Sequence, residues 1–136
     1  ELKLFNHKFV RQMPYANIRN RVSVDEAFWN AVRGNLNTVA EAEEWAKVCQ
    51  QPLAPIIEDL PLTSAAADNL PPEPWDENTY NEWMGAVKTK TARKGKELFH
   101  PIRKALTAQE NGPELKILLP LIGRNRAYKR LKGQTA

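Results

Sequence analysis

The sequence predicts an all-α protein, and three observations support that fold class. Apolar residues recur at helical spacing through most of the chain, while runs that alternate apolar and polar residues are few. No Asn-Gly or Asp-Gly turn joins two alternating runs, since the one Asn-Gly, at Asn111, leads directly into Pro113. Two segments have the spacing of a helix capping box. At 136 residues, the chain suffices for one domain or two small subdomains that share a core.

Three helices are expected in the first part of the chain. Apolar spacing predicts an amphipathic helix over residues 2–13. Ser-Val-Asp-Glu, which begins at Ser23, and Thr-Val-Ala-Glu, which begins at Thr38, each predict the capped start of a helix. Acidic residues in the first turn of the third helix suit its dipole. We expect Pro52 and Pro55 to end that helix.

A proline-rich segment divides the chain. A short helix is expected over residues 62–70, and Pro-Pro-Glu-Pro-Trp-Asp follows at 71–76. Closely spaced prolines make a stiff, non-helical connector. We therefore expect a connecting helical subdomain over residues 1–72 and a distal, basic helical subdomain over residues 73–136.

The distal subdomain is expected to contain further helices. Asp76 is expected to cap the first of them, and Pro101 fits either the first turn of a helix or a kink. Gly112 is expected at a turn with Pro113 in the following first turn, and a last helix is expected over 124–132. The expected core consists of Phe28, Leu36, Val39, Trp45, Ile56, Leu60, Trp83, Val87, Leu98, Ile102, Leu106, Leu115, Leu118 and Leu119.

Charge is distributed very unevenly. Residues 1–85 carry 7 Lys and Arg against 13 Asp and Glu, and residues 86–136 carry 13 against 3, so a net charge of −6 precedes one of +10. Such a split is typical of a face that binds a polyanion, and a solvated basic end without a partner is the simpler alternative.

Several classes of protein are excluded by composition. The apolar runs are too short to cross a bilayer. The single cysteine, Cys49, rules out an internal disulfide framework and fits a reducing cytoplasm. The first residue is Glu1, so the sequence is interpreted as a piece of a longer protein.

Neither catalytic residues nor a metal or cofactor site are expected within the chain. The two histidines, His7 and His100, lie far apart, and the carboxylates show no metal-ligand spacing. No nucleophile elbow, glycine-rich phosphate loop or dinucleotide motif occurs. We expect His100 to be a packed or capping residue rather than a general base.

The basic half contains two candidate binding segments. Arg103 follows the Pro101 break, near a glycine turn that carries a cluster of cations, and arginine can contact both phosphates and base edges. The second segment, Asn-Gly-Pro-Glu-Leu, opens a helix whose backbone donors suit an unstacked base or a phosphate. Solvated helix faces and an ordinary helix start are the simpler alternatives. The cluster comprises Lys88, Lys90, Arg93, Lys94, Lys96, Arg103 and Lys104.

These segments resemble the C-terminal end of bacterial glutamyl-tRNA synthetases. GKELFHPIRKALT matches that family's Pro-hydrophobic-Arg-x-Ala-Leu-Thr segment, and GPELKILLPLIGRNRAYKRL matches its Gly-Pro-x-Leu segment. LFNHKFVRQM is similar to the family's Leu-x-x-x-Asn-x-x-Tyr-Ile-Arg helix, and FWNAVRGNLNTVAEAEEW to its connecting helices. The resemblance covers essentially the whole chain, and its two C-terminal segments are specific.

The resemblance implies the anticodon-binding region of a class I aminoacyl-tRNA synthetase, an all-α cage. The parent enzyme would attach glutamate to tRNA(Glu) using ATP and Mg²⁺, both bound by an upstream catalytic domain whose motifs are absent from this sequence. The implied partner of this chain is tRNA, and we expect a cytoplasmic monomer.

Some of the family's tRNA contacts carry over by motif. Arg103 matches an arginine that contacts anticodon nucleotides. The helix start that approaches the first anticodon base corresponds to Gly112, Pro113, Glu114 and Leu115. The family's Arg-Pro-Arg-Phe-Asp-Thr stretch, whose second arginine checks the third anticodon base, corresponds to Arg33, Gly34 and Asn35 onward. Asn35 is shorter and neutral, which predicts that glutamine tRNA is accepted too. The alternative is that Asn35 only turns the chain and that Arg33 does the checking.

Two other functions are compatible with the sequence. One is a generic basic helical module that binds another RNA or an acidic protein. The other is the anticodon region of an enzyme that charges tRNA with glutamine. For the implied interface, the full set of expected tRNA-binding residues is Arg33, Asn35, Arg93, Lys94, Lys96, Arg103, Gly112, Pro113, Glu114 and Leu115.

Overall fold

A computed structural model of the chain describes residues 7–20, 22 and 24–136. Helices and turns make up this part of the chain, with no strand, so the predicted all-α fold class is confirmed. The α-helices are α1 (His7–Gln12), α2 (Glu26–Val32), α3 (Glu41–Gln50), α4 (Leu60–Asp68), α5 (Thr79–Thr91), α6 (Lys96–Thr107), α7 (Leu115–Ile122) and α8 (Arg124–Leu131), with short 3₁₀ turns η2 (Tyr15–Asn17) and η3 (Arg33–Asn35).

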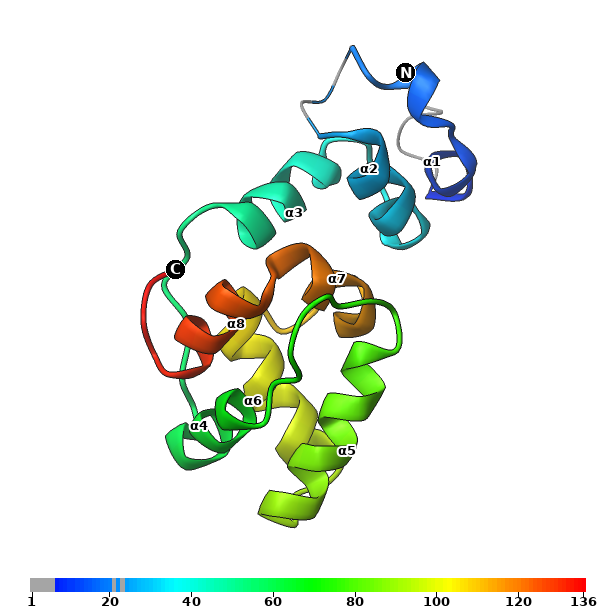
Figure 1. Cartoon of the computed structure of the whole chain (residues 1–136). Helices are drawn as coiled ribbons and strands as arrows, with labels where there is room; N and C mark the ends of the chain where they lie inside the picture. The colour runs from blue at the N-terminus through cyan, green and yellow to red at the C-terminus, as the bar shows by residue number, and fades with distance from the viewer. Residues whose placement is uncertain (1–6, 21, 23) are drawn as a thin grey trace.

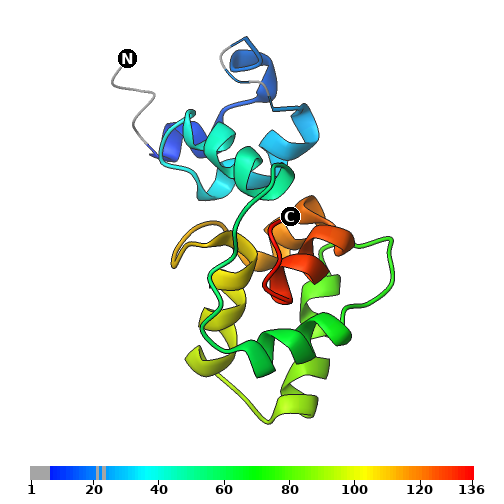
Figure 2. The same ribbon diagram turned by 90° about the vertical axis from the view of Figure 1, so that its left-hand side faces the viewer.

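The helices form two groups that meet at α7. Figure 1 shows α1, α2 and α3 in one group and α4, α5, α6, α7 and α8 in the other. Helix α7 packs against α2 and α3 on one side and against α5 and α8 on the other. The same division is visible in the perpendicular view of Figure 2. Helix α4 packs against α5, α6 and α8, although it precedes residue 72. The expected boundary between residues 72 and 73 stays a prediction.

The predicted capping residues at the starts of α2 and α3 differ from those observed. Residues 2–6 of the predicted 2–13 helix and Ser23 lie outside the described residues. Asp25 caps α2, and its Oδ1 accepts the N–H of Phe28 at 2.8 Å. Helix α3 begins at Glu41, three residues after the predicted cap Thr38. The carboxylate of Glu41 reaches back to accept the N–H of Thr38 at 2.8 Å, so one half of the predicted capping box is present.

The distal helices begin and end near the predicted residues, with two corrections that involve proline. Residues 71–76 are non-helical, as predicted, and Asp76 Oδ1 accepts the N–H of Asn78 at 2.8 Å just before α5. Pro101 lies inside α6, so its predicted place in a first turn is wrong, and the alternative of a kink stays a prediction. Pro113 precedes α7, whose N-cap is Glu114, so its predicted place in the first turn of that helix is wrong.

The core includes all but two of the predicted side chains. Ile56 is 42% exposed because it lies in the extended linker before α4, and Leu60 is 51% exposed because it opens that helix on the solvent side. The two fully buried tryptophans have satisfied polar atoms: Trp29 Nε1 donates to Met13 O at 2.8 Å, and Trp83 Nε1 to Ala66 O at 2.7 Å. Burying an indole without such a partner would be costly.

Arginines of α8 hold the two helix groups together. Arg130 is fully buried and donates to the carbonyl oxygens of Leu106 and Gln51. Arg126 Nη2 donates to Gln50 O at 2.8 Å. These carbonyls lie at the C-terminal ends of α6 and α3, where the last carbonyls of a helix lack intrahelical partners and cations are favoured. Several cations of the basic terminus are therefore helix caps.

Candidate nucleic-acid interface

A hollow of about 260 Å³ lies between the start of α5, the middle of α6 and the start of α7. Basic and aromatic side chains share its wall, which is the composition expected of a surface that binds an unstacked nucleobase. Three of the residues predicted to bind tRNA meet here: Arg103 from α6, and Glu114 and Leu115 from the start of α7. The other lining residues are Tyr80, Asn81, Phe99 and Lys116.

Arg103 supplies a guanidinium group to the wall of the hollow. Its Nη2 donates to the carbonyl oxygen of Pro113 at 3.1 Å. Its Nη1 is buried and has no hydrogen-bond partner within the described part of the chain. Burial lowers the pKa of Arg103, and the nearby Tyr80 opposes that effect, but a guanidinium remains cationic in proteins. A buried charged donor without a partner is costly, so this nitrogen suits an acceptor atom of a ligand.

The loop before α7 forms a second wall. Gly112 has φ +152°, a conformation that favours glycine, and its backbone lies against the ring of Trp45 on α3. Glu114 is exposed and forms an ion pair with Lys116 at 3.4 Å, while Leu115 is buried. The carbonyl of Pro113 faces Arg103. The loop therefore presents backbone and a carboxylate at the edge of the hollow.

Two aromatic rings of the hollow were not among the predicted site residues. Tyr80 is half-buried, and its ring meets that of Trp83 edge-on at a centroid distance of 6.3 Å. Phe99 is 37% exposed, and Lys88 Nζ lies 5.4 Å from its ring centroid. Phe99 precedes Arg103 by four residues, so helical spacing could have identified it as a neighbour on the same face. Tyr80 comes from another helix and has no comparable signal in the sequence.

The predicted cations at the junction of α5 and α6 have different environments. Arg93 pairs with Asp59, the residue that caps α4, and this contact lowers the pKa of that carboxyl group. Lys94 and Lys96 are exposed and form no ion pair with another described residue. Arg93 is thus engaged within the protein, and the two lysines are available to phosphates.

Arg33 and Asn35 lie on a different element, the turn η3, which packs against α1 and α2. Arg33 Nη1 donates to Met13 O at 2.9 Å. The half-exposed side chain of Asn35 makes no hydrogen bond to the described residues. The structure therefore does not bring these two residues into the hollow, and they form a separate candidate contact.

The described residues contain no group of three or more His, Cys, Asp or Glu side chains placed to hold a metal ion. Every helix in the described ranges is too short or too polar to span a membrane.

The fold and the hollow define an α-helical domain with a cationic, aromatic-walled surface hollow. The chain belongs to the family described as the anticodon binding domain, whose family model matches residues 14–134. The family predicted from the two C-terminal motifs is therefore confirmed.

Similar proteins extend this result. The chain is 43% identical over 143 residues to glutamate–tRNA ligase 2 of Beijerinckia indica, covering 100% of this chain and 32% of that protein. It is 47% identical over 143 residues to glutamate–tRNA ligase of Azospirillum brasilense, again covering 100% and 32%. The chain thus spans about a third of the length of these relatives.

A solved structure supports the fold. The crystal structure of glutamate-tRNA synthetase from Elizabethkingia anophelis matches with a TM-score of 0.71 and 14% sequence identity, covering 95% of this chain and 30% of that one.

Proposed function

We propose that this chain is the anticodon-binding part of a glutamate–tRNA ligase and that it binds tRNA(Glu) through the anticodon. The family and the relatives support this function, and the observation that carries it is the hollow lined by Arg103, whose buried Nη1 has no hydrogen-bond partner among the described residues. The ligase reaction, with its ATP and Mg²⁺, would belong to the remainder of the whole enzyme. We further propose that the protein acts as a cytoplasmic monomer.

In this proposal, an unstacked anticodon base enters the hollow. Arg103 Nη1 donates to an acceptor on the base edge, and the rings of Tyr80 and Phe99 contact its apolar faces. Glu114 lies where it can accept from an exocyclic amino group. The exposed lysines at the α5–α6 junction hold the phosphate backbone, which fixes the register of the loop without recognising sequence.

The test measures tRNA affinity of the full-length enzyme at fixed salt. Arg103→Ala is expected to weaken binding of tRNA(Glu) by about 1–3 kcal/mol, because a base contact is lost. Lys129→Ala is the matched control, since that cation is exposed on α8 and lies away from the hollow. Equal affinities for wild type and Arg103→Ala, with both proteins folded by circular dichroism, would contradict the proposed site.

We also propose that Asn35 relaxes selection at the third anticodon base, so that the enzyme glutamylates tRNA(Gln) as well. The unpaired amide of Asn35 supports this, because it can donate to or accept from either base, whereas an arginine only donates. The neighbouring Arg33 is already bonded to Met13 O, although its guanidinium has donors to spare.

The deciding assay charges both tRNAs with the full-length enzyme. Wild type is expected to charge both, and Asn35→Arg is expected to shift the ratio of activities toward tRNA(Glu). Strict preference of the wild type for tRNA(Glu), or a ratio that Asn35→Arg leaves unchanged, would refute relaxed selection while leaving the anticodon-binding function intact.

A further inference from the structure

We propose that Trp45, on α3, is a positioning residue for the hollow. Its ring packs against Gly112 and so holds the loop between α6 and α7, which forms one wall of the hollow. A residue of the α1–α3 group thereby fixes a wall of a site that the α4–α8 group builds. This inference rests on the proposed function of the hollow in binding anticodon bases. Trp45 does not line the hollow and is only 7% exposed, so its effect on a bound base would be indirect.

The contact between Trp45 and Gly112 is unusually close. A side chain at Gly112 would place its Cβ 2.2 Å from Cη2 and 2.3 Å from Cζ2 of the Trp45 ring. Real Cβ atoms do not approach other atoms so closely, so only glycine lets the loop lie on the ring. The φ of +152° at Gly112 also favours glycine. The position of the loop is therefore defined by the indole beneath it.

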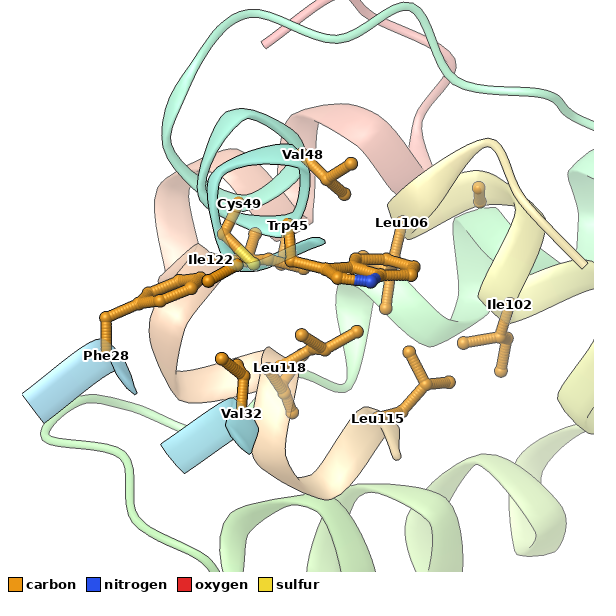
Figure 3. Packing of buried hydrophobic residues seen from close by; sticks show 14 of the residues in the cluster. Phe28, Val32, Trp45, Val48, Cys49, Ile102, Leu106, Leu115, Leu118 and Ile122 are labelled. Atoms are coloured by element: carbon orange, nitrogen blue, oxygen red, sulfur yellow. The ribbon is translucent and has the colours of Figure 1, made fainter. Parts of the chain in front are cut away.

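The opposite side of the loop is tied to α6. Arg103 Nη2 donates to Pro113 O at 3.1 Å, and Lys104 Nζ lies 3.4 Å from Glu110 Oε1. Figure 3 shows the indole of Trp45 extending from α3 toward Leu106, above the apolar side chains of α7. The loop is thus held between α6 and an indole from α3, and the bond that orients Arg103 belongs to this arrangement.

Removal of the ring should release Pro113 from Arg103. The guanidinium would then lose the bond that aims its free Nη1, and the hollow would lose one wall. Because the rest of α3 is anchored by other buried side chains, including Val48 and Cys49, the loop should be affected more than the fold. Trp45 is expected to act on RNA through Arg103, and the two residues should be energetically coupled.

A double-mutant cycle on the full-length enzyme tests this coupling. Trp45→Leu is expected to weaken binding of tRNA(Glu) about tenfold, and to reduce discrimination against a tRNA with an altered anticodon base. In the Arg103→Ala background, Trp45→Leu should change affinity by less than about twofold, since its route to the base is already lost. Val48→Ala, on the same helix and also buried, controls for loss of stability and should leave affinity unchanged.

Gly112→Ala provides an independent variant if Trp45→Leu folds poorly. It pushes the loop away from an intact ring and should reproduce the loss of affinity and of discrimination. If Arg103→Ala binds as wild type does, the hollow is not the site, and its proposed role in binding an anticodon base falls together with this inference. If Arg103→Ala binds weakly, either of two results overturns this inference alone. The first is that the affinity losses of Trp45→Leu and Arg103→Ala add in the double mutant. The second is that Trp45→Leu and Gly112→Ala bind tRNA(Glu) as the control Val48→Ala does.

Discussion

Arg130 is expected to be the most stabilising cation of the chain, and its replacement by methionine tests that expectation. The guanidinium is fully buried and forms a three-way junction: Nε donates to Ala136 O at 2.8 Å, Nη1 to Leu106 O at 2.8 Å and Nη2 to Gln51 O at 3.1 Å. Methionine has similar length and fills much of the same space without any donor. Arg130→Met therefore removes the three bonds and leaves most of the apolar packing.

The magnitude follows from the surroundings of each acceptor. The Leu106 carbonyl lies in the buried part of the junction, so leaving it unsatisfied should cost about 1–3 kcal/mol. The carbonyls of Gln51 and Ala136 are only partly buried and can turn to water, which limits each loss to about 0.5–1.5 kcal/mol. Relief from burying a charge offsets part of this sum. We expect a loss of about 3 kcal/mol in the free energy of unfolding.

Denaturant unfolding followed by circular dichroism measures this loss directly, and thermal unfolding should show a decrease in Tm of roughly 10 °C. Arg130→Lys keeps the charge but lacks the fork of donors, so it should recover only part of the stability. Lys129→Met, an exposed neighbour, should stay within about 0.5 kcal/mol of wild type. A wild-type midpoint for Arg130→Met would refute the idea that carbonyl capping by α8 stabilises the fold.

Three further predictions concern other charged or titratable groups. Burial raises the pKa of the Cys49 thiol to about 12, so iodoacetamide at pH 8 should label it only when α3 undocks, at a rate that denaturant increases. The pKa of Asp59 is lowered chiefly by its hydrogen bond from Arg93. The contribution of this carboxylate to stability is therefore present above about pH 4 and is lost as pH falls through the lowered pKa. Asp59→Asn should be less stable than wild type at pH 7, and the difference should vanish in acid. The exposed lysines of the α5–α6 junction are Lys90, Lys94 and Lys96. Replacing all three by glutamine should reduce the slope of log tRNA affinity against log salt concentration by about 2. An unchanged slope would place the RNA backbone elsewhere.

Helical periodicity was sufficient to predict the class and order of the elements, because each helix buries one apolar face. It was less informative at helix starts, where several polar residues compete to cap the same N–H groups. Asp25 accepts the N–H of Phe28 in α2. At α3, Glu41 accepts the N–H of Thr38, and the Thr38 side chain caps no N–H of the helix. A capping motif predicts that a helix begins nearby, but the choice among adjacent oxygens depends on the tertiary path of the chain. Leu60 shows the same dependence, since its apolar character did not determine which side of α4 faces solvent.

The candidate site could be predicted only in part for a related reason. Arg103 and the residues around Pro113 belong to local motifs, so the sequence was enough to single them out. Tyr80 enters the hollow from another helix, and the Trp45 ring lies against Gly112, in the loop beside the hollow, from the other helix group. Contacts between elements distant in sequence have no local signature. Gly112 was predicted as a turn, but its second role, leaving room for an indole, depends on where α3 docks.

The basic residues of the second half of the chain fall into two kinds, those bonded within the protein and those exposed to solvent, and net charge alone does not distinguish them. Arg126 and Arg130 donate to backbone carbonyls, which carry no formal charge, so the two arginines are held in place without being neutralised. Their positive potential extends beyond the protein and can attract a polyanion, although their donors are already occupied. In the proposed complex, direct phosphate contact is expected from exposed lysines such as Lys94 and Lys96, which pair with no other described side chain. The salt dependence of binding depends on the number of counterions that direct phosphate contacts displace. It should therefore be far smaller than if all 13 basic residues after position 85 contacted phosphates.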